Sequence, residues 1–122
     1  MGQITERNIM PVKNSLLAIP LTSLNAAAVA IGFAPVNPNG LAEPCVILRI
    51  INDQTMPITI SYDGLTDHDY LPARGILQIN AQTNSLPKGN ICRFNKGSII
   101  YVAGVAGVGN VVVAGYYQPA GA

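Results

Sequence analysis

Short runs rich in β-branched residues, each bounded by Gly, Pro or Asn, follow one another along the sequence. Residues 58–62 alternate between apolar and polar side chains, as a strand with one buried face does. Residues 45–51 are apolar almost throughout, which predicts a central strand with both faces covered. Since no segment carries a long helical period, the pattern predicts an antiparallel β-sandwich or barrel.

About eight strands are expected, which fits an all-β fold, namely an antiparallel β-sandwich with a jelly-roll-like arrangement. The runs at 45–51 and 58–62 are predicted to form a hairpin that turns at 52–54. Residues 25–28, Asn-Ala-Ala-Ala, fit a helical turn as an alternative to strand. Connections are expected at 35–40, 63–74, 81–90 and 104–109. The expected strands are residues 16–24, 26–33, 45–51, 58–62, 77–80, 91–94, 98–103 and 111–117.

The length of 122 residues is that of one domain with a core of its own. We expect an extended N-terminal arm over residues 1–14, a β-sandwich domain over residues 15–118 and a C-terminal tail over residues 119–122. Cys45 and Cys92 show no metal-binding spacing. Two buried free thiols are favoured over a disulfide, and the pairing stays open.

Charged residues make up only 11% of the chain, against roughly 25% in a typical soluble domain. This deficit predicts an apolar surface that a partner covers. A membrane is disfavoured as that partner, because the most apolar segment, residues 15–34, is interrupted by Pro20, Ser23 and Asn25. The net charge of +1, with the basic residues scattered, predicts no nucleic-acid binding.

The same segment permits a second interpretation, a secretory signal with small residues near a cleavage point. That interpretation predicts a mature chain that starts near Val29 or Ile31. Glu6 in the region that should be basic, and the breaks at Pro20 and Asn25, speak against it.

Residues 63–70, Asp-Gly-Leu-Thr-Asp-His-Asp-Tyr, hold the single histidine of the chain beside three carboxylates. The spacing fits neither an EF-hand loop nor a zinc site. We therefore expect a solvated loop whose side chains cap its own backbone, with no metal or other cofactor. The weak metal candidates would be Asp63, Asp67, His68 and Asp69.

Chemistry of other kinds has little support in the sequence. No nucleophile elbow and no phosphate-binding glycine loop with its lysine is present, so we expect no enzyme. Tyrosines in or beside strands would suit sugar stacking in a lectin-like receptor-binding module, but packing in a core or interface is favoured. These tyrosines are Tyr62, Tyr101, Tyr116 and Tyr117.

Several strand and turn motifs together resemble the small β-sandwich virion proteins of tailed bacteriophages, over residues 15–118. The motifs are Cys-Val-Ile-Leu-Arg-Ile-Ile-Asn-Asp at 45–53, Ile-Thr-Ile-Ser-Tyr-Asp-Gly at 58–64, Asp-His-Asp-Tyr-Leu-Pro-Ala at 67–73, Lys-Gly-Ser-Ile-Ile-Tyr-Val at 96–102 and Gly-Tyr-Tyr-Gln at 115–118. The resemblance implies a virion structural protein. Its first form is a capsid decoration or cement protein that bridges capsid subunits, and its alternative is a ring component of the head–tail connector or tail.

The expected partners are the major capsid protein or other virion proteins, together with further copies of this chain. Contacts are expected through the N-terminal arm, through the loops around Asp67 and Gly107, and near the end of the last strand. The predicted contact residues are Ile4, Ile9, Pro11, Asp67, His68, Val105, Val108 and Tyr117.

Overall fold

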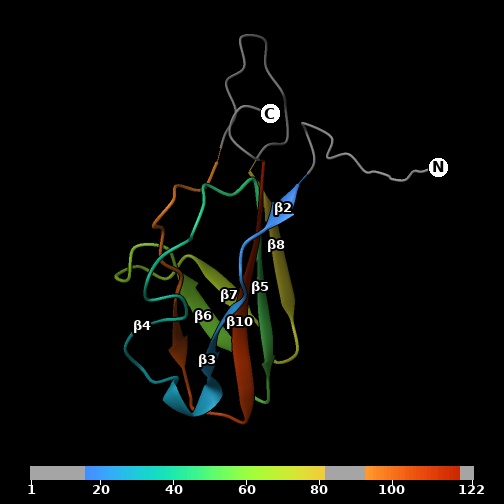
Figure 1. The fold of residues 1–122 in the computed structure, drawn as a ribbon. Coiled ribbons are helices and arrows are strands. Elements are labelled where there is room, and N and C mark those ends of the chain that lie inside the picture. Colours follow the sequence, from blue (N-terminus) through green and yellow to red (C-terminus); the bar gives the residue numbers. More distant parts are fainter. Residues whose placement is uncertain (1–15, 82–92, 119–122) are drawn as a thin grey trace, which may run out of the picture.

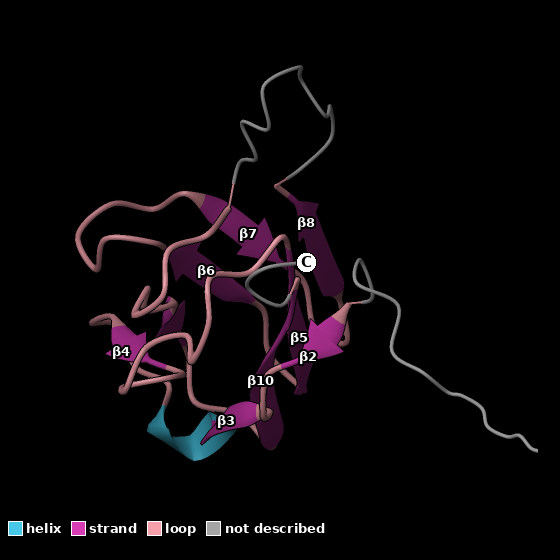
Figure 2. Cartoon of the chain, turned by 45° about the horizontal axis from the view of Figure 1, so that its top comes forward, coloured by secondary structure: helices cyan, strands magenta, loops and turns pink. Residues whose placement is uncertain are grey.

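The computed structural model describes residues 16–81 and 93–118, and it confirms the all-β fold. Two antiparallel sheets form a β-sandwich (Figure 1). The helical structure of the described residues is the short 3-10 turn η1 (Ala26–Ala28), next to β3 in Figure 2. The jelly-roll arrangement is not confirmed by the strand orders below. None of the described helices is long and apolar enough to cross a membrane.

The five-stranded sheet is built around its longest strand, β10 (Gly109–Tyr117). One side of β10 pairs with β5 (Ile47–Gln54), and β5 pairs in turn with β8 (Ile76–Asn80). The other side of β10 pairs with two short strands, β2 (Leu17–Ala18) and β3 (Thr22–Asn25). Strands that are distant in sequence therefore meet on β10.

The four-stranded sheet has the order β4-β9-β6-β7. Its strands are β4 (Ala34–Pro35), β9 (Tyr101–Gly104), β6 (Ile58–Ser61) and β7 (Asp69–Leu71). The alternation predicted for residues 58–62 is confirmed in β6 for Ile58 and Ile60, which are buried, but it is wrong for Ser61, which is also buried and donates a hydrogen bond to Asp63. β7 lies inside the segment 63–74 that was expected to be a loop, so that expectation is wrong for residues 69–71.

The core fills the space between the two sheets. Inward positions recur at every second residue, as strand geometry requires. Burial of one large apolar side chain at such a position contributes about 1.5–3 kcal/mol to the stability of the fold. The core includes Leu48, Ile50, Val111 and Val113 from the large sheet, Ile58, Ile60 and Val102 from the small one, and Val36, Leu41 and Ile100 from the segments beside them.

The predicted hairpin of residues 45–51 and 58–62 is wrong. β5 runs on to Gln54 and belongs to the five-stranded sheet, whereas β6 belongs to the other sheet. The chain crosses between the sheets at 55–57. Asn52, which was expected to turn the chain, is fully buried, and its Nδ2 donates to the carbonyl oxygens of Met56 (2.9 Å) and Pro72 (3.0 Å). Because its Nδ2 group has hydrogen-bond partners, Asn52 can be buried, and β5 continues past this residue instead of turning there.

The expectation that both faces of residues 45–51 are covered is also wrong. Leu48 and Ile50 are buried, but Ile47, Arg49 and Ile51 on the opposite face of β5 are only partly buried. This strand therefore contributes to the core with one face and to the molecular surface with the other.

The strand predicted at 26–33 is replaced by η1 and a connection. Asn25 caps η1 with its side-chain oxygen, which accepts a hydrogen bond from the amide of Ala27 (2.9 Å). Alanine favours helix over strand, so the Ala-Ala-Ala run follows this cap. The alternative of a helical turn at 25–28 is confirmed.

The strand predicted at 98–103 begins only at Tyr101. Its first part is held by a loop residue, Asn37, which is 1% exposed. Asn37 Nδ2 donates to the carbonyl oxygen of Ser98 (3.0 Å), and its Oδ1 accepts from the amide of Ile100 (2.7 Å). The side chain thus replaces a neighbouring strand as hydrogen-bond partner.

Three sets of expectations fall partly outside the described residues. They are the arm over 1–14 with its contact residues Ile4, Ile9 and Pro11, the tail over 119–122, and the strand at 91–94 with the partner thiol Cys92. Of that strand, Phe94 forms an isolated bridge with Cys45. The thiol of Cys45 is buried, and burial, followed by the charge of Glu43, raises its pKa above the usual value.

Candidate interaction surface

One end of the sandwich is built from two segments without a charged or polar side chain, residues 26–33 and 104–109, which we call the apolar end. At the lower end of the molecule in Figure 1, η1 and the β9–β10 connection lie side by side. The amide of Gly104 donates to the carbonyl oxygen of Ala30 (2.7 Å), and that of Gly107 to the carbonyl oxygen of Ala26 (3.2 Å). These bonds hold the two segments together as one surface.

The β9–β10 connection is shaped by its glycines. Gly104 and Gly109 have φ angles of 155° and 125°, which side chains with a Cβ rarely adopt. Next to this connection, Thr55 Oγ1 accepts a hydrogen bond from the amide of Val108 (3.1 Å), and the amide of Thr55 donates to the carbonyl oxygen of Val108 (3.2 Å). The backbone is thereby fixed while the valine side chains point to solvent.

Large apolar side chains are exposed on the apolar end. Ile31 is 94% exposed, Val108 74% and Val105 60%. Exposed apolar side chains that lie together are typical of interaction sites in soluble proteins. The smaller exposed residues around them are Ala27, Ala28, Ala30, Gly32 and Ala106.

Sequence reasoning found part of this surface and missed the rest. Val105 and Val108 were predicted as contact residues and are exposed here, whereas Ile31 was assigned to a strand. A signal for it exists in the sequence: no charged residue occurs between Lys13 and Glu43, and none after Lys96. Both segments of the apolar end come from these charge-free stretches.

The loop of residues 63–68 is organised by Asp63. Its Oδ1 accepts hydrogen bonds from the amides of Leu65 (2.8 Å) and Thr66 (2.9 Å) and from the hydroxyl of Ser61 (2.9 Å). These donors, with a smaller contribution from His68, hold the pKa of Asp63 well below its usual value. The prediction that side chains of this loop cap its own backbone is confirmed for Asp63, whereas Asp69, which was expected in the same loop, lies in β7.

The histidine in this loop is also used locally. His68 Nδ1 accepts a hydrogen bond from the amide of Tyr62 (3.0 Å), and the two rings stack with centroids 5.4 Å apart. The hydroxyl of Tyr62 donates to Asp69 Oδ2 (2.7 Å). Burial, the hydrogen bond to Asp69 and the charge of Asp69 together raise the pKa of Tyr62.

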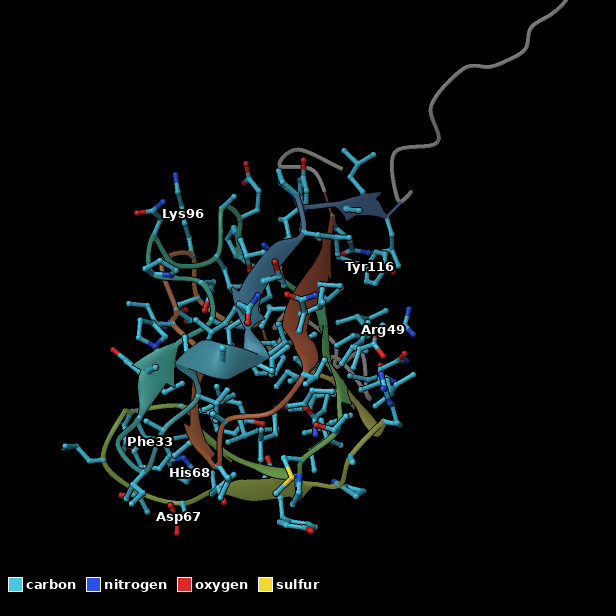
Figure 3. All side chains as sticks on the ribbon, turned by 90° about the horizontal axis from the view of Figure 1, so that it is seen from below. Phe33, Arg49, Asp67, His68, Lys96 and Tyr116 are labelled. Atoms are coloured by element: carbon cyan, nitrogen blue, oxygen red, sulfur yellow. The ribbon has the colours of Figure 1, made fainter. Side chains whose placement is uncertain are left out.

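The four weak metal candidates do not converge. In the parts of the chain that the structure describes, no three His, Cys, Asp or Glu side chains are grouped so as to hold a metal ion. His68 Nε2 lies 4.0 Å from Asp63 Oδ2, Asp69 is bonded to Tyr62, and Asp67 is exposed. Figure 3 shows Asp67 and His68 next to each other at the edge of the molecule in that view.

The tyrosines do not form one platform. Tyr62 packs against the core, and the ring of Tyr101 lies next to Gly64 in the same region. Tyr116 and Tyr117 belong to β10 in the other sheet, and Tyr117, a predicted contact residue, is partly buried against the core. Stacking of one sugar on all four rings is therefore not supported.

Comparison with known proteins gives no relative: no protein-family model, no curated protein and no solved structure matches the chain.

Proposed function

We propose that this chain is a structural protein of a virion, and specifically a capsid decoration or cement protein that stabilises a phage head by bridging capsid subunits. The observation that carries the proposal is the apolar end, where Ile31, Val105 and Val108 are exposed on two segments that have no charged side chain. The motifs of strands β5, β6 and β9, which resemble small phage virion proteins, support the same class.

The proposed mechanism is passive. Docking would remove the exposed side chains of Ile31 and Val108 from water, and full burial of one such side chain contributes about 1.5–3 kcal/mol. A contact of this size is weak alone. Many copies on a shell, each touching the major capsid protein or another virion protein, would convert it into a stable lattice through multivalency.

The test is co-sedimentation. Virion particles produced from a genome that lacks the coding sequence of this chain are mixed with the purified chain and pelleted. We expect the wild-type chain to pellet with the particles. The double variant Ile31→Ser, Val108→Ser is expected to bind at least about tenfold more weakly. It loses the burial of two apolar side chains, and each loss of about 1.4 kcal/mol in binding free energy weakens the affinity tenfold.

The matched control is Leu21→Ser, which removes a side chain of 68% exposure from the connection between β2 and β3. Both the control and the double variant should unfold within about 0.5 kcal/mol of the wild type, because exposed side chains contribute little to stability. A wild-type chain that stays in the supernatant, or a double variant that binds like the control, would contradict the proposal.

A further inference from the structure

The outer face of the five-stranded sheet is a second surface of unusual composition. Residues paired across the strands lie on the same face, so the strand register defines its rows. One row contains Val112, Ile51 and Ile76, and the next contains Ala114, Arg49 and Gln78. Ile51 and Val112 are partly buried, and Ile76 is 57% exposed. The third row contains Ala18, Tyr116, Ile47 and Asn80. We call the six residues of the first two rows, together with Ile47 and Tyr116, the Arg49 face.

Arg49 is the positively charged residue of this face and lies in its second row, between Ala114 and Gln78. Arg49 is partly buried, and its buried Nε has no hydrogen-bond partner among the residues that the structure describes. Among the described residues, the carboxylate that lies on the same side of β5, Asp53, is already paired with Arg74, whose Nη1 donates to Asp53 Oδ1 (2.6 Å). Figure 3 shows Arg49 and Tyr116 on the same side of the molecule and Lys96 on another.

An arginine inside an apolar surface has a well-defined complement. Its planar guanidinium binds a carboxylate through two parallel hydrogen bonds, and surrounding apolar side chains strengthen that pair by excluding water. Arginine is accordingly one of the residues that dominate binding energy at protein interfaces. Ile47, Ile51 and Val112 supply the apolar surroundings here.

We infer that the Arg49 face is a second docking surface, which binds a partner protein through a carboxylate that pairs with Arg49. The inference rests on the proposed function, because a protein that bridges subunits needs two separate surfaces, and this face lies on the side of the sandwich rather than at its apolar end. A single cation among apolar residues does not suit a nucleic acid, which needs several phosphate contacts. A second copy packed face to face about a two-fold axis would bring the same eight residues against Arg49, and none of them is a carboxylate.

The experiment uses the same particles and two substitutions, Arg49→Glu and Arg49→Gln. We expect Arg49→Glu to weaken binding at least tenfold and Arg49→Gln to weaken it less, because glutamine removes the charge without repelling the carboxylate. Lys96→Glu and Lys96→Gln are the matched controls, since Lys96 is an exposed cation elsewhere on the chain, and binding should change less than twofold. Circular dichroism and thermal unfolding of each variant test that the fold is kept.

A second measurement identifies the partner group directly. Carbodiimide couples amines to carboxylates but leaves arginine unmodified, so an Arg49→Lys chain bound to particles should form an amide bond at position 49 that the wild-type chain does not form. Mass spectrometry of the product locates the carboxylate on the partner.

The outcomes separate the two proposals. A wild-type chain that does not pellet contradicts the proposed function. A wild-type chain that pellets together with an unaffected and folded Arg49→Glu variant overturns the Arg49 face alone. A bound Arg49→Lys chain that couples only through its other lysines also overturns it, whereas coupling at position 49, or loss of binding in the folded variant, supports it.

Discussion

The carboxylate of Asp63 accepts the hydrogen bonds that hold its loop, so the stability of this loop should depend on pH. The donors around it lower its folded-state pKa, so the stabilisation is complete above the ordinary carboxyl value of 3.8 and is lost as the pH falls through the depressed value. Protection of the Leu65 and Thr66 amides against hydrogen exchange is expected to decrease between about pH 5 and about pH 2. Exchange measured by NMR, corrected for intrinsic rates, gives this protection.

The control is Asp63→Asn, which keeps an accepting oxygen but does not titrate. In this variant the protection of the two amides should be independent of pH over the same range. Protection that is as pH-dependent in the variant as in the wild type would show that another group is responsible.

At the level of elements, the start of β10 depends on Gly109. This residue has a φ of 125°, and a Cβ added to it would collide with the carbonyl oxygen of Asp53 on β5. Gly109→Ala is expected to lower the free energy of unfolding by at least about 2 kcal/mol, because both the conformation and the contact are unfavourable. Urea denaturation measures the change.

Gly32→Ala is the matched control at the same end of the sandwich. No atom lies within 4 Å of a Cβ added there, and its φ is not in the positive range. Stability should be unchanged or rise by up to about 1 kcal/mol, since alanine restricts the unfolded chain. Equal losses in both variants would mean that neither the φ of Gly109 nor its contact with Asp53 causes the loss of stability.

How well the sequence predicts the structure differs from element to element. Alternation was sufficient to predict β6 and β8, whereas β10 was predicted from its run of β-branched residues. It failed at residues 52–54, where Asn52 and Gln54 have the polarity of a turn but lie fully buried in β5. The carbonyl groups of Met56 and Pro72 that bind Asn52 come from other segments, and a local pattern does not reveal them.

The candidate surfaces were predictable to a similar degree. The exposure of Val105 and Val108 follows from a glycine-rich connection between two strands, which places them on the surface. Ile31 depended on recognising that Asn25 begins a helical turn. The Arg49 face depended on the register of β10, β5 and β8, which unites residues from three distant parts of the chain.

At the scale of the whole molecule, β10 holds the five-stranded sheet together, because three other strands pair with it. A chain that ends after Val108 lacks β10, so β2, β3 and β5 lose their common partner. We expect this truncated chain to show no cooperative thermal transition in calorimetry. A chain that ends after Gln118 retains every described strand and should unfold cooperatively, and cooperative unfolding of the shorter chain would contradict the central role of β10.

The late position of β10 also affects biosynthesis. A ribosome adds roughly 5–20 residues per second, and until it has passed Tyr117 the nascent chain carries β5 with an open edge. An unpaired apolar edge can template aggregation with other chains. Folding of the five-stranded sheet must therefore wait until β10 has been synthesised, so the yield of this protein in a cell depends on protection of its incomplete form.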